Sequence, residues 1–279
     1  MNYRHRYHAG NFADLMKHAL LVCLLEALSR KAAPWCYFDS HAGAGLYDIA
    51  AGAAQRTGEA AAGIGRLWPL RATAPGAVLT LCRIVADCNP DSAVPRYYPG
   101  SPRIAAALTR GQDRLILAER HPEEAACLKQ QCRTTPQAAV HLRDGYEMVP
   151  ALVPPAERRG LVLMDPPFER ADEFEALAGA CLAAHTRWPG GVYALWYPLK
   201  EAAPVARFER TLRRSGMRRI LLAELRLGPG QGPMLAGSGL AIVNPPWQCE
   251  LGMAEALSFL AHALAPGQSS HALRWLVGE

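Results

Sequence analysis

The feature that most constrains the fold is an apolar run, Gly160 to Met164, that leads directly into Asp165-Pro-Pro-Phe168. A run this short and this continuously apolar is typical of a strand buried on both faces, as in the interior of a parallel sheet. Two consecutive prolines end such a strand, because they fix φ and remove two N–H donors. We therefore expect a central strand with a rigid turn at its carboxyl end.

Other short apolar segments alternate with segments of helical periodicity along the chain. Because parallel neighbours need crossover connections, this alternation predicts an α/β, Rossmann-like, doubly wound fold. We expect a seven-stranded, mostly parallel sheet with one antiparallel strand, the last. The predicted strands are residues 35–38, 115–118, 139–142, 160–164, 191–196, 219–225 and 239–243, and the predicted helices are 13–30, 78–87, 122–133, 174–187 and 205–214.

Residues 48–108 depart from this alternation. They are rich in alanine and glycine and contain Pro69, Pro75, Pro95, Pro99 and Pro102. We expect this block to be a small helical insertion in a core formed by residues 1–47 and 109–279.

The chain has 279 residues and a formal net charge of +5. Such an excess permits a nucleic-acid partner without indicating one, because phosphate contact depends on local basic patches. Two basic patches exist, and the second of them could equally well be solvated arginines on an ordinary helix. The patches are Arg4, His5, Arg6 and His8, and then Arg207, Arg210, Arg213, Arg214, Arg218 and Arg219.

The first residues are polar and basic, so we expect no secretory signal. The longest apolar run, Ala19 to Leu25, is too short to cross a bilayer. The eight cysteines never fall as Cys-x-x-Cys, and none of their spacings matches a zinc site. We therefore expect a cytoplasmic protein with free thiols and no metal. We also expect a monomer.

Acidic residues follow three successive predicted strands. Asp39 precedes the loop His41-Ala-Gly-Ala-Gly45, Glu119 ends the next strand, and Asp144-Gly145 follows the third. Ligands of doubly wound sheets bind at these strand ends, where Gly43 would allow close backbone approach and Glu119 could accept hydrogen bonds from ribose hydroxyls. Each acid could instead cap a helix, and Gly-x-Gly could be a plain turn.

Asp165-Pro-Pro-Phe168 suits the chemistry of an exocyclic base amine, whose lone pair is delocalised into the ring. If the Asp165 carboxylate and the Pro166 carbonyl accept hydrogen bonds from the two N–H groups of the amine, they favour a pyramidal nitrogen whose lone pair can face a methyl sulfonium. Phe168 offers a face on which an extruded base can stack.

Asn244-Pro-Pro-Trp247 also follows an apolar strand and fits the same pattern. The preceding strand is the one we expect to run antiparallel, so Asn244 should lie at the opposite edge of the sheet. We therefore assign the chemistry to Asp165 and a structural role to Asn244.

In this order, the Gly-x-Gly loop, Glu119, Asp144 and the Asp-Pro-Pro-Phe motif resemble class I amino-methyltransferases of the N6-adenine type. Nearly the whole chain resembles the RlmJ family of bacterial 23S ribosomal RNA adenine-N6 methyltransferases. The matching segments are Tyr3 to His18, Asp39 to Gly45, Arg56 to Glu59, Arg96 to Pro102, Asp165 to Phe168, Tyr193 to Pro198 and Asn244 to Trp247.

The resemblance implies S-adenosylmethionine as the methyl donor and 23S ribosomal RNA as the partner. It implies Asp165 as the catalytic residue and places Tyr3 near the RNA. Lys17 is a further candidate for the donor site. The donor site that the resemblance implies consists of His18, His41, Ser101, Glu119, Asp144 and Gly145.

Several alternatives stay open at this stage. The same chemistry could act on DNA adenine or on guanine N2, and a non-catalytic RNA-binding assembly factor could retain the fold. An NAD-dependent oxidoreductase is disfavoured because Asp48 stands where the third glycine of the dinucleotide motif would fall. His5, His8, His18 and His41 do not have the spacing of a helical metal site.

Overall fold

A computed structural model describes residues 5–51, 57–90, 92–228 and 236–279. All seven predicted strands and all five predicted helices are present, with ends shifted by a few residues. The strands are β1 (Cys36–Asp39), β2 (Leu46–Asp48), β3 (Tyr97–Pro99), β4 (Arg114–Glu119), β5 (Ala138–Leu142), β6 (Gly160–Met164), β7 (Val192–Pro198), β8 (Ile220–Arg226), β9 (Gly237–Val243) and β10 (Ser270–Val277). The helices are α1 (Phe12–Ser29), α3 (Glu59–Ala62), α4 (Ile64–Leu67), α5 (Gly76–Asp87), α6 (Ser101–Leu108), α7 (Pro122–Gln131), α8 (Gly145–Leu152), α9 (Glu173–Arg187), α10 (Ala202–Arg214) and α11 (Cys249–Leu264), with 3₁₀ turns η1 (His5–Tyr7), η2 (Trp68–Thr73) and η3 (Cys132–Thr134).

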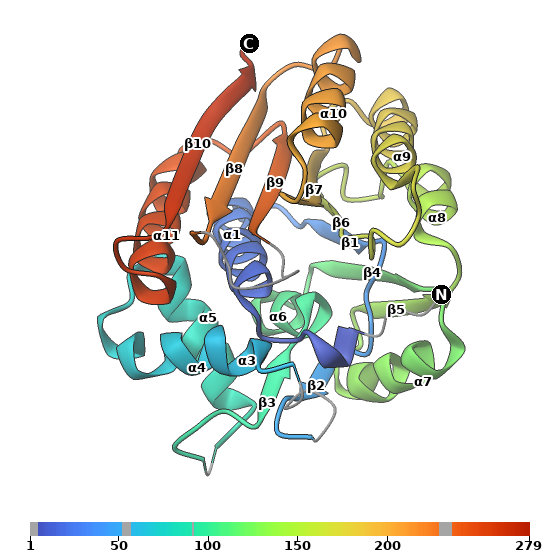
Figure 1. Ribbon diagram of the computed structural model, residues 1–279. Helices are drawn as coiled ribbons and strands as arrows, with labels where there is room; N and C mark the ends of the chain where they lie inside the picture. Colours follow the sequence, from blue (N-terminus) through green and yellow to red (C-terminus); the bar gives the residue numbers. More distant parts are fainter. Residues whose placement is uncertain (1–4, 52–56, 91, 229–235) are drawn as a thin grey trace.

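The main sheet has eight strands in the order β10-β8-β9-β7-β6-β1-β4-β5 (Figure 1). Strands β5, β4, β1, β6 and β7 are mutually parallel, and β9 runs antiparallel between β7 and β8. The α/β, mostly parallel architecture is confirmed, but the expected number of strands is wrong. β10, which we did not predict, pairs antiparallel with β8 at the edge, so two strands run against the others.

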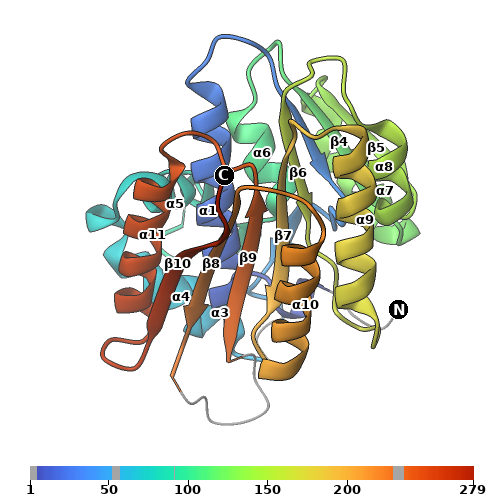
Figure 2. The same cartoon turned by 90° about the horizontal axis from the view of Figure 1, so that it is seen from above.

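Helices cover both faces of the sheet (Figure 2). Alternation along β6 explains why both faces are apolar: Leu161 and Leu163 join the core beneath α1 and α11, while Val162 and Met164 join the core beneath α8, α9 and α10. A strand with a hydrophobic layer on each side has no polar positions, as its sequence indicated.

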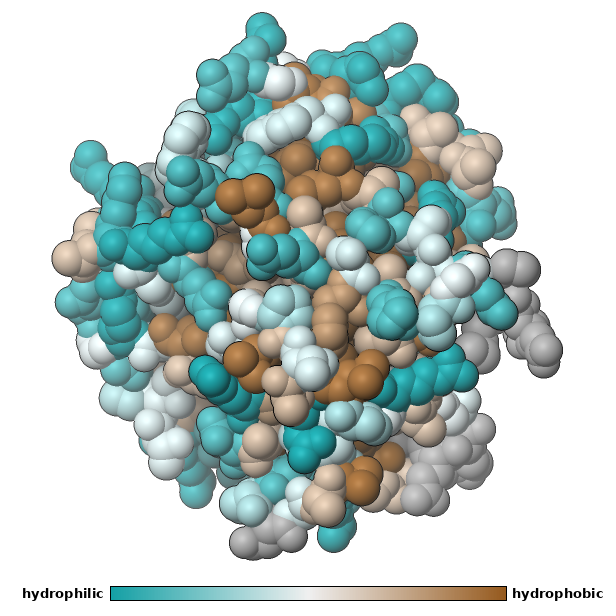
Figure 3. Space-filling model, turned by 90° about the vertical axis from the view of Figure 1, so that its left-hand side faces the viewer, coloured by the Kyte–Doolittle hydropathy of each residue, from teal (hydrophilic) through white to brown (hydrophobic). Residues whose placement is uncertain are grey.

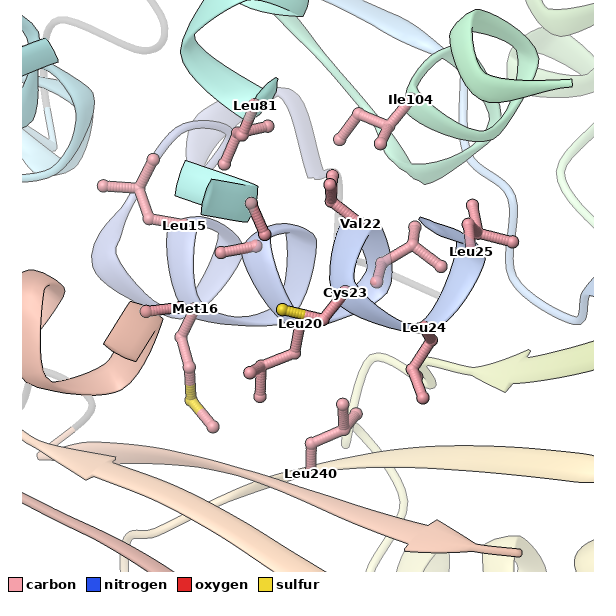
Figure 4. Close-up of a cluster of buried hydrophobic side chains, with 14 of the residues drawn as sticks. Leu15, Met16, Leu20, Val22, Cys23, Leu24, Leu25, Leu81, Ile104 and Leu240 are labelled. Atoms are coloured by element: carbon pink, nitrogen blue, oxygen red, sulfur yellow. The ribbon is translucent and has the colours of Figure 1, made fainter. Parts of the chain in front are cut away.

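Helix α1 lies almost entirely within the protein, which explains why it is apolar around most of its circumference. Figure 4 shows Leu24 directed toward Leu240 of β9, while Leu15 and Val22 face Leu81 of α5 and Ile104 of α6. The helix therefore connects the central sheet to the segment around α5 and α6.

Residues 48–108 include the helices α3, α4, α5 and α6, in line with helical content. Their apolar side chains, such as Leu67, Val78 and Ile104, belong to the same core cluster as α1. Strands β2 and β3 pair antiparallel in a small separate sheet, with Tyr47 opposite Tyr98. The division of the chain at residues 48 and 108 stays a prediction.

All eight cysteines are free. Among the described residues, no helix combines the length and apolar character that crossing a membrane requires.

Leu24→Ala tests whether α1 is a packing centre. Leu24 has no exposed surface, so truncation should lower the free energy of unfolding by about 2–5 kcal/mol, measured by urea denaturation. Leu251→Ala on α11 is the matched control, because Leu251 is 72% exposed and should cost far less. Equal losses for the two variants would contradict the packing described for α1.

Candidate active site at the carboxyl ends of the strands

A cavity of about 680 Å³ lies beside the carboxyl ends of β1, β4, β6 and β7. It is large enough for a nucleoside-sized ligand and more. Tyr3 lies outside the described residues. Every other predicted site residue lines the cavity: Lys17, His18, His41, Gly43, Ser101, Glu119, Asp144, Gly145, Asp165, Pro166 and Phe168.

The glycine loop after β1 is tied to the end of β4 through Glu119. The carboxylate of Glu119 accepts a hydrogen bond from the Gly43 backbone N–H at 2.8 Å and from the His121 backbone N–H at 2.7 Å. Gly43 has a positive φ of 62°, and a β-carbon there would lie 2.1 Å from the Tyr47 hydroxyl. Only glycine fits this position, so the loop brings bare backbone to the cavity wall.

The start of α8 closes against the same loop. A β-carbon on Gly145 would lie 1.8 Å from the Ser40 carbonyl oxygen, so the two backbones are in direct contact. Asp144 caps α8 by accepting a hydrogen bond from the Tyr146 N–H at 2.9 Å. The His41 ring lies edge-on to Tyr146, and burial lowers the pKa of His41 to about 4, so it is neutral at pH 7.

His18 and Ser101 take part in buried hydrogen bonds behind the cavity wall. The His18 Nδ1 lies 2.9 Å from the Tyr98 hydroxyl, and burial lowers the pKa of His18 to about 3. Ser101 donates to the Asp39 carboxylate at 2.7 Å, and burial raises the pKa of Asp39 to about 6. Both His18 and Ser101 therefore present neutral groups, and Asp39 helps to position Ser101.

Lys17 links two carboxylates. Its ammonium donates to Asp14 at 2.9 Å and also to Asp165. Burial by itself lowers the pKa of Lys17, but the two carboxylates more than offset this and raise it. Burial likewise raises the pKa of Asp14, but His5 and Lys17 hold it well below its usual range. Lys17 therefore stays protonated and fixes Asp165 relative to α1.

The turn after β6 is strained at Phe168, whose φ of 51° lies in the left-handed region. The Phe168 ring makes edge contacts with Phe174 at 4.8 Å and with Trp196 at 5.6 Å between centroids. These contacts support a backbone conformation that an aromatic residue rarely adopts, and such strain is typical of functional turns.

Asn244 lies at the opposite edge, as predicted from the direction of β9. Its side-chain amide donates to the Pro189 carbonyl at 2.7 Å and to the Gly191 carbonyl at 2.9 Å, before the start of β7. Asn244 does not line the cavity. Its contacts are those of a structural residue, which agrees with the choice of Asp165.

Three comparisons with known proteins are consistent. The chain matches the family described as "Ribosomal RNA large subunit methyltransferase D, RlmJ" over residues 32–277. It is 37% identical to the ribosomal RNA large subunit methyltransferase J of Escherichia coli and, separately, 37% identical to that of Haemophilus influenzae, over 281 residues and the full length of each. The chain belongs to the RlmJ family. A crystal structure of a Legionella pneumophila protein, 34% identical, superposes with a TM-score of 0.90 over 96% of this chain and 98% of that one.

Some residues that line the cavity were not among the site residues predicted from the sequence. Asp14, Tyr146 and Trp196 line it, and Asp14 holds Lys17. The i, i+3 spacing of Asp14 and Lys17 at the start of a helix would have indicated their ion pair. The contact of Lys17 with Asp165 spans 148 positions in sequence, and no local pattern predicts it.

The buried ion pair between Lys17 and Asp14 can be tested with a double-mutant cycle. Lys17→Met leaves Asp14 buried without its ammonium and should lower the free energy of unfolding at pH 7 by about 3–5 kcal/mol. Adding Asp14→Asn removes the uncompensated charge and should restore much of that loss. If the double variant lost as much free energy of unfolding as Lys17→Met, or more, the result would contradict the ion pair.

The decrease in the free energy of unfolding caused by Lys17→Met should depend on pH. Asp14 has a depressed pKa, so its contribution is present above its ordinary value of 3.8 and is lost as the pH falls through the folded value. Lys17 has a raised pKa, so its contribution is present below its ordinary value of 10.5. The destabilisation should therefore be largest between these limits and shrink in acid.

Proposed function

We propose that this chain transfers a methyl group from S-adenosylmethionine to the N6 amine of an adenine in 23S ribosomal RNA. The observation that carries the proposal is Asp165. It stands at the carboxyl end of β6, on a cavity that the glycine loop and Glu119 also line. The names of the two relatives, both ribosomal RNA large subunit methyltransferases, support the choice of RNA.

The residues of the cavity fit an adenosine-containing donor. Gly43 and Gly145 stand at two points of the wall where a β-carbon has no room, so backbone lies directly at the cavity. Each oxygen of Glu119 accepts one backbone hydrogen bond and keeps lone-pair capacity for a ribose hydroxyl. His41 and Asp144 are placed to contact the rest of the nucleoside. When bound, the donor supplies an electrophilic methyl group on its sulfonium sulfur.

Asp165 and the Pro166 carbonyl would orient the amine. One oxygen of Asp165, Oδ2, is held by Lys17, which leaves Oδ1 for a proton of the substrate amine. With its protons engaged, the amine nitrogen directs its lone pair away from them, toward the methyl group. A strong base is unnecessary, because the amine proton becomes acidic only after transfer makes the nitrogen cationic.

Phe168 and Trp196 supply an aromatic wall beside the amine site. Both line the cavity and touch each other edge to face. Stacking on such rings stabilises a base that has left its own stack. The Lys17 ammonium lies 5.9 Å from the centre of the Trp196 ring, so the same side chain contacts both the aromatic wall and Asp165.

Within this proposal the enzyme acts as a monomer in the cytoplasm, and Tyr3 contacts the RNA. Free thiols at all eight cysteines suit a reducing compartment. DNA adenine or guanine N2 as the acceptor, and a non-catalytic assembly factor, are the competing outcomes that the substrate assays distinguish.

Asp165→Ala should reduce methyl transfer to RNA by at least about 10²-fold, because the amine loses its principal acceptor. Donor affinity, measured by calorimetry, should stay close to that of the wild type. Asn244→Ala is the matched control, since it removes the first residue of the other Pro-Pro motif. A comparable loss of transfer in Asn244→Ala, assayed well below its melting temperature, would reverse the assignment.

Glu119→Gln should weaken donor binding by about 10- to 100-fold, because hydrogen bonds to a charged acceptor contribute about 1.5–3 kcal/mol. Glu123→Gln, on the exposed side of α7, should leave donor affinity unchanged. The measurement is calorimetric titration with S-adenosylhomocysteine. Unchanged affinity in Glu119→Gln would remove Glu119 from the donor site.

A further inference from the structure

Helix α10 presents a row of arginines on the face opposite its buried side. Val205, Phe208 and Leu212 are buried, whereas Arg207, Arg210 and Arg214 are exposed. Spacings of three and four residues place these arginines on one face, directly opposite the apolar face. The row spans about 10 Å along the helix axis. We call Arg207, Arg210 and Arg214 the arginine row.

The positive charge of this face is not neutralised by acids. Glu209 is the only acidic residue between positions 202 and 219, and it accepts from Arg274 of β10 at 2.6 Å. Within the part of the chain that the structure describes, the arginine row forms no ion pair. Arg213 and Arg218, also exposed, extend the positive surface toward the end of the helix.

Other faces differ in charge. Helix α11, on the other side of the sheet, contains no lysine or arginine but has Glu250 and Glu255. Figure 3, which views the side where α11 and β10 lie, shows hydrophobic residues scattered among hydrophilic ones. Helix α10 therefore carries a positive surface that α11 lacks.

Two features connect α10 to the active site. Lys200, which lines the cavity, precedes the helix by two residues. Beneath the helix, an aromatic series runs from Phe168 to Phe174 at 4.8 Å and from Phe174 to Phe208 at 5.3 Å. The buried side of α10 is thus packed, through one ring, against the turn that carries Asp165. A ligand held on the outer face of α10 would have a fixed position relative to that turn.

Resting on the proposed function, we infer that the arginine row of α10 binds the phosphate backbone of the RNA substrate. Exposed guanidinium groups at regular intervals on a rigid helix match a series of phosphates, to which arginine can bind with two hydrogen bonds. Such contacts position the nucleic acid without reading its sequence. The row would hold the strand that flanks the target adenine while that base enters the cavity.

The triple variant Arg207→Gln, Arg210→Gln and Arg214→Gln tests this inference, because exposed glutamines preserve the helix and remove only charge. Binding to protein-free 23S RNA is measured over a range of salt concentrations. The matched control is Arg83→Gln, Lys129→Gln and Arg133→Gln, which removes the same charge from exposed positions elsewhere. Each lost phosphate contact should reduce the slope of log K against log salt by about 0.7–0.9.

The arginine-row variant should therefore lose about two units of slope and bind about 10- to 100-fold more weakly at low salt, while the control keeps the wild-type slope. Affinity for S-adenosylhomocysteine should be unchanged in both. Equal effects of the two triple variants would overturn the inference and leave the methyltransferase proposal intact. A slope reduced only in the arginine-row variant, with no methyl transfer by the wild type, would support the inference and overturn the proposed function instead.

Discussion

The ammonium group of Lys17 joins two charged side chains from distant parts of the chain, since Asp165 lies 148 positions after Lys17. It donates a hydrogen bond to Asp14 in the first turn of α1 and another to Asp165 in the turn after β6. Such an ion pair is costly to bury and stable only when every charge has a partner. Asp14 meets that condition by also accepting hydrogen bonds from His5 and from the Gly10 backbone N–H. The position of the Asp165 carboxylate therefore depends on the correct packing of the first residues described.

The fold supplies the rigidity that this arrangement needs. Helix α1 is buried between the sheet and the helices α5 and α6, so Lys17 projects from one of the most fully buried helices of the molecule. The turn that carries Asp165 is held from the other side by Phe174 and Trp196. Gly43 and Gly145 also line the cavity, and a β-carbon at either position would clash with Tyr47 or with the Ser40 carbonyl. Together these features hold Asp165, the glycine loop and the start of α8 around one cavity, as the proposed methyl transfer requires.

Much of this organisation was predictable from local sequence patterns. Gly160–Met164 is buried on both faces, as a continuous apolar run indicates, and the strand ends at Glu119 and Asp144 converge because parallel strands share an edge. The choice between Asp165 and Asn244 followed from the order of the strands along the chain and from the direction expected of the last one. Strand β10 was missed because its exposed edge position leaves a mixed sequence, Ser270–Val277, with little apolar alternation. The Lys17–Asp165 contact and the Phe168–Trp196 packing depend on tertiary structure, which no local period reveals.

We propose that the protein methylates an adenine amine of large-subunit RNA in the cavity beside Asp165. The most direct measurement is transfer of labelled methyl from S-adenosylmethionine to protein-free 23S RNA, 16S RNA and duplex DNA, followed by nucleoside analysis of each product. We expect N6-methyladenosine in 23S RNA and no label in 16S RNA or duplex DNA. Label in DNA, a methylated guanine, or tight donor binding without transfer to any substrate would contradict it.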